Sequence, residues 1–436
     1  MQEAMKTYNL VLMDQRGTGR SSPLSCSRLA EWQRQHGTAL LVDFMGCFRA
    51  DSIVRDAEIV RKCLLGEQSW SVLGQSFGGF CAVHYLSLAN ASLTGATPLK
   101  QVFITGGLPR IAPSPYNAKD VYRACLQRVT AASCRFFQLY PVDRARVAAL
   151  AAAVAEGADG GTGHDSTPLS EDSRYIVLCD GSRFTMRRLA SYGLVLGLSS
   201  GHGTLHTVLE SAFTCRKAAA KAAPAAAASA EGSDSPLHAF DVLGDSAAAA
   251  APGKDEAKLE VPDLRHNERF ATVFRDTAGM VSNVMYWLMH ESIYAQGSAT
   301  EWAAQAVVQE HEAEHKVTAQ NFQFFGEMVF PWMAQDYPEF QALEPLAQAL
   351  ATRCDWPALY DTQALEGNKV PTVATVYSKD VFVPEEMSKE TAAQIGCCTV
   401  VENAADQHDG LHVNSAAVLG AMLNPPSTPE AASTQT

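Results

Sequence analysis

The run Gly74-Gln75-Ser76-Phe77-Gly78 constrains this chain more than any other feature. It fits the pattern Gly-x-Ser-x-Gly, which places a serine on a sharp turn between a strand and a helix. Flanking glycines suit such a strained turn, because they let the strand and helix backbones approach closely. The apolar residues 70–73 predict a buried strand before the turn, and residues 80–88 predict a helix after it. The sequence therefore predicts a nucleophile elbow at Ser76.

The composition is that of a soluble globular protein, with 47% hydrophobic and 19% charged residues among 436. A chain of this length can bury a large core and is expected to form two or three structural units. The net charge of −13 argues against nucleic acid or an anionic membrane as a main partner. No window approaches the roughly 20 apolar residues needed to span a bilayer.

The amino-terminal residues and the cysteines both favour a cytoplasmic protein. Residues 1–15 carry early charges and lack a small-residue cleavage site, so they do not resemble a secretory signal. The eleven cysteines are scattered without metal-type spacing, which favours reduced thiols. We expect no metal and no organic cofactor.

The predicted elements alternate between strands and helices, which favours an α/β fold with a mostly parallel sheet. A final helix is predicted over 414–423, and a long block of helical patterns over 118–350 interrupts the strands. The predicted strands cover residues 8–13, 70–75, 101–105, 372–377 and 398–401.

These patterns predict a core divided by an inserted helical cap. The first part of the core is expected over residues 1–112, the cap over 113–352 and the second part of the core over 353–425. Within the cap, the alanine-rich stretch 217–258 is interrupted by prolines and predicts a largely disordered insertion. Residues 426–436 are expected to form a disordered tail.

A serine nucleophile needs a base, and the base needs an acid that orients it. In α/β-hydrolases these follow the serine in the order Asp or Glu, then His. Asp380 follows the predicted strand 372–377, and His408 follows the predicted strand 398–401. Both residues therefore fall at carboxyl ends of late strands, where open α/β sheets place their sites.

Other titratable residues compete with this assignment. Asp406 and Asp409 flank His408 and are predicted to be solvent-exposed loop residues. His84 lies in the helix behind the elbow and is predicted to be packed. His412, one helical turn after His408, is the closest rival as the base.

Several motifs together resemble the proline iminopeptidase family of α/β-hydrolase serine aminopeptidases. The resemblance implies removal of an amino-terminal residue, typically proline, from short peptides with a free amino terminus. It also implies Ser76 as nucleophile, His408 as general base and acid, and Asp380 as the orienting acid. Beyond the Asp380/His408 pair, the segments that carry it are DQRGTGRSS, GQSFGG, TGGLP, DGSRFTMRRLASYGLVLGLSSGHGTLHTVLESAF, WLMHESIYAQG, FFGEMVFPWM and WPALYD.

The resemblance also implies carboxylates on the cap that hold the substrate's amino group. Glu291 in WLMHES and Glu327 in FFGEMVF match the two segments concerned. An ammonium group that enters a closed pocket loses water and needs an opposite charge with good hydrogen-bond geometry. A surface glutamate, or one paired with a cap arginine, is the alternative for each position.

The sequence departs from the family at the oxyanion loop. Family members carry an HGGPG-like loop upstream of the DQRG strand, whereas this chain begins near that strand. We therefore expect one oxyanion donor, the backbone N–H of Phe77, and an unpaired sheet edge. A truncated gene model explains this most simply, and a catalytically impaired binding protein is the alternative.

One competing motif, His311-Glu312-Ala313-Glu314-His315, fits the H-E-x-x-H pattern of zinc peptidases. Its neighbours are almost all polar, which suits an exposed helix better than a buried metal site. No third ligand is evident in the sequence. We interpret the match as chance and keep the metallopeptidase as a remote alternative.

Overall fold

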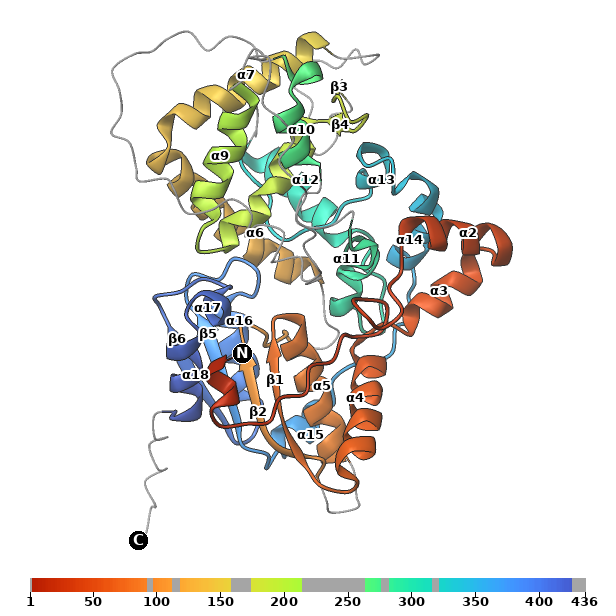
Figure 1. Cartoon of the computed structure of the whole chain (residues 1–436), viewed down its shortest axis with the longest axis vertical. Helices are drawn as coiled ribbons and strands as arrows, with labels where there is room; N and C mark the ends of the chain where they lie inside the picture. Colours follow the sequence, from red (N-terminus) through yellow and green to blue (C-terminus); the bar gives the residue numbers. More distant parts are fainter. Residues whose placement is uncertain are drawn as a thin grey trace, which may run out of the picture.

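A computed structural model describes residues 2–91, 97–111, 118–157, 174–213, 263–275, 282–315 and 321–425. The predicted insertion over 217–258 and the predicted tail over 426–436 lie outside these residues. Figure 1 shows a lower lobe that contains the sheet and an upper lobe made mostly of helices.

The lower lobe is built on a four-stranded parallel sheet in the order β1-β2-β5-β6. The strands are β1 (Trp70–Gln75), β2 (Leu99–Thr105), β5 (Thr372–Tyr377) and β6 (Cys398–Asn403). The sequence predictions for all four are confirmed within two residues. β5 is buried along its whole length, which explains its continuous run of β-branched and apolar residues.

Helices cover both faces of this sheet. Val102 and Ile104 of β2 point toward a cluster that includes α4 (Ala50–Leu65), α5 (Phe77–Ala91), α15 (Thr362–Glu366) and α16 (Glu385–Ala393). Phe103, between them in the strand, points to the other face, against α18 (Ser415–Leu423). The alternation follows from the two-residue period of a strand. The chain therefore has the layered α/β architecture that the sequence predicts.

The prediction of a strand at residues 8–13 is wrong. After α1 (Gln2–Met5), this segment is irregular, and it pairs with no strand among the described residues. Val11 and Leu12 are 53% and 71% exposed. Alternating apolar residues can form a strand only where a neighbouring edge accepts their backbone hydrogen bonds, and that pairing is missing here.

The upper lobe, called the cap below, is built from described elements between residues 118 and 351. It contains one short antiparallel pair, β3 (Ile176–Val177) with β4 (Arg183–Phe184), besides its helices. Two helices from the first part of the chain, α2 (Cys26–His36) and α3 (Thr38–Gly46), pack against this lobe at η6 (Gln341–Leu343) and α14 (Glu344–Ala351). The described cap elements are α6 (Ala118–Leu139), α7 (Pro141–Gly157), α8 (Met186–Ser191), η1 (Tyr192–Gly197), α9 (Gly201–Phe213), η3 (Leu264–His266), α10 (Glu268–Phe274), α11 (Val284–Met289), η5 (Glu291–Tyr294), α12 (Ala303–His315), α13 (Met333–Asp336), η6 (Gln341–Leu343) and α14 (Glu344–Ala351).

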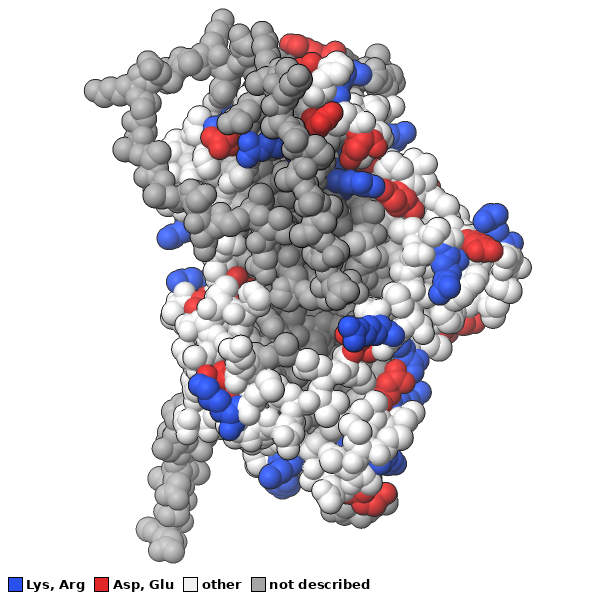
Figure 2. Space-filling model, in the orientation of Figure 1, with Lys and Arg blue, Asp and Glu red and all other residues white. Residues whose placement is uncertain are grey.

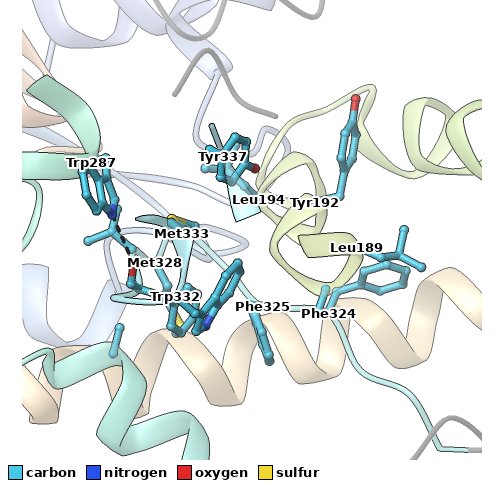
Figure 3. Close-up of a cluster of buried hydrophobic side chains, with 14 of the residues drawn as sticks. Leu189, Tyr192, Leu194, Trp287, Phe324, Phe325, Met328, Trp332, Met333 and Tyr337 are labelled. Carbon is cyan, nitrogen blue, oxygen red and sulfur yellow. Dashed lines mark hydrogen bonds between the residues drawn. The ribbon is translucent and has the colours of Figure 1, made fainter. Parts of the chain in front are cut away.

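The cap has an aromatic core of its own (Figure 3). Trp287 is buried, stacks on Phe340 with a ring separation of 4.5 Å, and donates its indole N–H to the carbonyl of Phe330 at 3.1 Å. The buried indole therefore gains stacking without leaving its polar atom unpaired. Other members of this core are Leu189, Tyr192, Leu194, Phe324, Phe325, Met328, Trp332, Met333 and Tyr337.

A buried ion pair fixes the turn into α8. Arg187 donates two hydrogen bonds to the carboxylate of Asp336, at 2.9 and 2.8 Å, and the hydroxyl of Thr185 adds a third at 2.7 Å. Thr185 also caps α8 by accepting from the N–H of Arg188 at 3.1 Å. This bidentate geometry compensates for the burial of both charges.

The surface carries charges of both signs. On the face shown in Figure 2, Lys and Arg side chains are interspersed with Asp and Glu over the described residues. None of the helices in the described ranges has the length and hydropathy to cross a bilayer.

We predict that Asp336→Ala lowers the free energy of unfolding by about 3–5 kcal/mol, because Arg187 is left buried without its counter-ion. Urea denaturation measures the change. Glu310→Ala, which removes the carboxylate from an exposed pair with Arg123, is the control and should cost less than about 1 kcal/mol. Equal urea midpoints for the two variants would contradict the prediction.

Candidate active site

Ser76 lies at the turn between β1 and α5 with a backbone φ of +52°, in the left-handed region. Its N–H donates to the carbonyl of Thr105 at 3.1 Å, which fixes the turn against β2. A Cβ on Gly74 would lie 2.2 Å from the carbonyl oxygen of Gly78. The first glycine of the motif is therefore required by the close approach of strand and helix, and the predicted strand, sharp turn and helix are present.

The Thr-Gly-Gly run after β2 completes this close packing. A Cβ on Gly107 would lie 2.4 Å from the carbonyl oxygen of Ser76. Gly106 has a φ of +53°, and a Cβ there would lie 3.2 Å from Nδ1 of His408. These two glycines let the backbone pass beneath both the elbow serine and the histidine.

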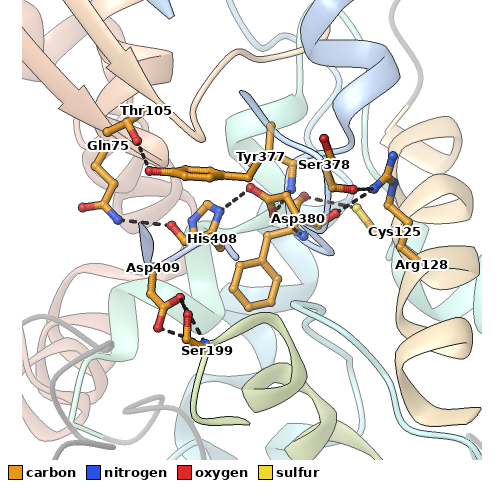
Figure 4. A network of polar contacts seen from close by, with 12 residues as sticks. Gln75, Thr105, Cys125, Arg128, Ser199, Tyr377, Ser378, Asp380, His408 and Asp409 are labelled. Carbon is orange, nitrogen blue, oxygen red and sulfur yellow. Dashed lines mark hydrogen bonds and ion pairs between the residues drawn. The ribbon is translucent and has the colours of Figure 1, made fainter. Parts of the chain in front are cut away.

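Asp380 and His408 form a buried pair, as Figure 4 shows. Oδ2 of Asp380 bonds to Nδ1 of His408 at 2.7 Å. Oδ1 accepts from the N–H groups of Phe382 and Val383, at 2.8 and 3.0 Å. The carboxylate is thus fixed by its own loop. It holds the imidazole with Nδ1 toward the acid, so Nε2 is the nitrogen left for a nucleophile.

Opposing effects act on the pKa of His408. Burial lowers it, but the charge of Asp380 and the hydrogen bond to that carboxylate outweigh burial, with further contributions from Glu327 and Asp409. The net pKa is raised above its ordinary value. The ring of His408 also packs edge-on against Phe382, at 4.8 Å between centroids. Asp380 therefore raises the pKa of His408, and Phe382 helps to orient its ring.

Four of the six predicted site residues line a cavity of about 1180 Å³ between the lobes, whereas Asp380 and Glu291 are not part of its lining. Ser76, Phe77, Glu327 and His408 all line it. Phe77 is the first residue of α5, where N–H groups have no intrahelical acceptor.

Comparisons with known proteins agree with this geometry. A family model for the alpha/beta hydrolase fold matches residues 2–124. Proline iminopeptidase from Aeromonas sobria is 31% identical over 423 residues, which cover 97% of this chain and 81% of that protein. The chain belongs to the proline iminopeptidase family. It is a prolyl aminopeptidase-like α/β-hydrolase.

Two further comparisons are weaker. Proline iminopeptidase aneH from Aspergillus aculeatus is 28% identical over 429 residues, covering 96% of this chain and 78% of that protein. Among solved structures, an alpha/beta hydrolase enzyme from a Medee basin deep-sea metagenome library matches with a TM-score of 0.29 at 10% identity. That match covers 87% of this chain and 74% of the other.

Glu327 reaches the cavity of this family member from the cap. Its Oε1 accepts a short hydrogen bond from the hydroxyl of Tyr286, and its backbone carbonyl contacts Nε2 of His290 at 3.2 Å. Burial, reinforced by the charge of Glu327, raises the pKa of Tyr286, so the phenol stays protonated and donates. Burial lowers the pKa of His290, which favours its neutral form. Among the described residues, none donates a hydrogen bond to Oε2 of Glu327.

The position of Glu291 does not support the predicted amine-binding role. Its buried carboxylate accepts from the N–H groups of Ala303 and Ala304, at 3.2 and 3.0 Å, at the start of α12. These bonds satisfy two of the N–H groups that a helix leaves unpaired at its first turn. Glu291 therefore serves as an anchor between η5 and α12.

The alternatives to the predicted triad have different surroundings. His84 is buried and bonds through Nδ1 to the carbonyl of Leu359, which agrees with its predicted packed role. His412 is exposed on α17 (Gly410–Val413). The prediction that Asp409 is exposed is wrong: it is only 7% exposed, and its carboxylate accepts bonds from Ser199 of the cap. Asp406, half-buried, accepts from Asn403 within the same loop.

The H-E-x-x-H match lies at the end of α12. Nε2 of His311 bonds to the side-chain oxygen of Gln323 at 2.8 Å, and Glu312 is buried. Among the described residues, no group of three or more His, Cys, Asp or Glu side chains is close enough to hold a metal ion.

Sequence reasoning missed Arg49, which lines the cavity from the start of α4. Its guanidinium donates to the carbonyls of Ser292, Ala295 and Pro357 and packs over Trp356 at 4.7 Å. Burial lowers its pKa to about 10. No local motif marks this arginine, because its acceptors are backbone groups of distant segments.

The elbow predicts contrasting effects for two adjacent glycines. A Cβ on Gly79 would lie 2.4 Å from the carbonyl oxygen of Gly107, so Gly79→Ala should cost about 1–3 kcal/mol of unfolding free energy. At Gly78 no atom lies within 4 Å of a built Cβ, and Gly78→Ala should be neutral or stabilising by up to about 1 kcal/mol. Urea unfolding distinguishes them, and equal stability of the two variants would refute the packing argument.

Proposed function

We propose that this protein is a serine aminopeptidase of the proline iminopeptidase type, which releases an amino-terminal residue, preferably proline, from short peptides. One observation supports this most strongly. Ser76 and His408, which is bonded to Asp380, line the same cavity as Glu327, a carboxylate supplied by the cap. A reacting group and an amine-binding group thus occupy one pocket.

The proposed reaction is acyl transfer to Ser76. Its hydroxyl oxygen attacks the first peptide carbonyl while Nε2 of His408 takes the hydroxyl proton. The negative oxygen of the tetrahedral intermediate accepts from the N–H of Phe77. The C–N bond then breaks, and the imidazolium returns its proton to the leaving amine. Water, activated by the same nitrogen, hydrolyses the ester and releases the free amino acid.

The raised pKa of His408 sets the pH range of this reaction. Because the base must be neutral to accept a proton, activity should rise with pH through that pKa. Asp380 stabilises the imidazolium that forms, so it contributes most when the positive charge develops.

Glu327 gives the pocket its selectivity for a free amino terminus. Its ionised carboxylate pairs with the substrate ammonium, and Tyr286 holds one of its oxygens in place. Part of the lining is apolar and aromatic, which suits a pyrrolidine ring and favours the cation through aromatic faces. This lining includes Leu194, Met285, Met289, Tyr294 and Phe382.

The nucleophile is tested with Ser76→Ala. We expect loss of labelling by a fluorophosphonate and a fall in kcat on a prolyl reporter amide by on the order of 10⁶-fold. Ser71→Ala, on the same strand, is the control and should label normally. Retained hydrolysis in Ser76→Ala, abolished by a chelator, would instead favour a metallopeptidase.

The amine-binding role is tested with Glu327→Gln on two substrates. Loss of the charge should cost about 2–5 kcal/mol on a free-amine prolyl amide, which is roughly 30-fold or more in kcat/KM. Hydrolysis of an amino-blocked prolyl ester should change little. Glu291→Gln provides the comparison, because its anchoring role predicts similar losses on both substrates. Equal losses on both substrates for Glu327→Gln would exclude it as the amine ligand.

A further inference from the structure

The loop that carries His408 is held by a residue of the cap. The carboxylate of Asp409 accepts from the backbone N–H of Ser199, at 3.1 and 3.0 Å, and from its hydroxyl at 2.7 Å (Figure 4). Ser199 lies in the turn between η1 and α9. Because the bonded carboxylate is buried, these charge-assisted bonds fix the residue next to the base.

The loop that carries Asp380 is held by another element of the cap. Arg128 on α6 donates to the backbone carbonyls of Ser378 and Asp380, at 3.1 and 3.2 Å, and pairs with the exposed Glu386. One turn earlier on the same helix, the thiol of Cys125 contacts the carbonyl of Phe382 at 3.2 Å. The cap therefore contacts the backbone on both sides of the acid.

The same cap turn also packs against the acid loop. A Cβ on Gly197 would lie 2.2 Å from the ring of Phe382, so glycine is required where the turn meets this side chain. Phe382 in turn packs edge-on against His408. Residues 197–199 are thus wedged between the loop of the acid and the loop of the base.

We propose that Arg128 and Ser199 are positioning residues, through which the docked cap holds Asp380 and His408 in register with Ser76. This inference rests on the proposed triad. Neither loop is part of a strand, so the sheet alone does not fix either one. Catalytic groups must be held within about 0.5 Å of their productive geometry, which requires supporting contacts of this kind. In this protein the cap supplies them.

The experiment compares Arg128→Ala, Ser199→Ala and the double variant with wild type. Three quantities are measured: the rate of fluorophosphonate labelling of Ser76, kcat and KM on a prolyl amide, and the urea midpoint. We expect labelling rate and kcat to fall together by about 10-fold in each single variant and up to about 10²-fold in the double variant. KM should change little, because neither side chain lines the cavity.

Matched controls separate positioning from general damage. Arg123→Ala removes an exposed arginine from the same helix, and Glu386→Ala removes only the exposed partner of Arg128. Both should label at the wild-type rate. Ser199→Thr keeps the hydroxyl and should restore most of the labelling rate lost in Ser199→Ala.

Two outcomes would overturn the inference. One is a folded double variant that labels at the wild-type rate. The other is a fall in labelling rate and kcat that follows the fall in urea midpoint across all variants, whether or not the contact to the catalytic loops was removed. Failure of the proposed function looks different. Wild type would then label at Ser76 without hydrolysing the prolyl amide, and the labelling comparison would still decide the positioning role.

Discussion

The parallel pairing of β2 with β5 is the contact on which the site depends. β2 ends beside the elbow, β5 leads to the acid, and the whole cap separates them in sequence. Their register, with Thr105 opposite Thr375, places the Thr-Gly-Gly run under the loops that follow the strands. β6 then adds the strand that precedes His408. A shift of this register would move Asp380 and His408, which follow β5 and β6, away from Ser76, which follows β1.

The cap has two roles in the arrangement that we infer. Its inner surface contributes Glu327 and the apolar lining, which define what can enter the cavity. Its lower edge, at Arg128 and Ser199, contacts the loops that carry the acid and base. A cap that swung away as a rigid lid would release those loops. Substrate recognition and triad geometry are therefore linked through one interface.

Local sequence patterns were sufficient for features with local physical causes. The strands at residues 70–75 and 372–377 are short apolar runs, and a buried parallel sheet needs such runs. Residues 8–13 also have a strand-like pattern. Whether they form a strand depends on the edge of a neighbouring strand, which the sequence of this segment does not predict. Asp409 lies in a polar loop whose sequence predicts exposure to solvent, but its hydrogen-bond partner Ser199 belongs to the cap, 210 residues earlier in the sequence. Such long-range partners explain most of what sequence reasoning missed.

The two cap glutamates illustrate the same limit. Both lie among aromatic and apolar residues, and no local pattern distinguishes their roles. Glu291 turns toward the first turn of α12, whereas Glu327 turns toward the cavity. The different roles of the two glutamates depend on where the first turn of α12 lies in the fold, and local sequence composition does not predict that position.

The order of the catalytic groups along the chain has a consequence for synthesis in the cell. Ser76 is translated early, and its elbow is built from neighbouring residues. Asp380 and His408 are added only after the cap has been made. Under the proposed mechanism, a ribosome-bound intermediate therefore carries Ser76 before the residue that would accept its proton has been synthesised. We expect Ser76 to be a poor nucleophile in such an intermediate until β5 and β6 join the sheet.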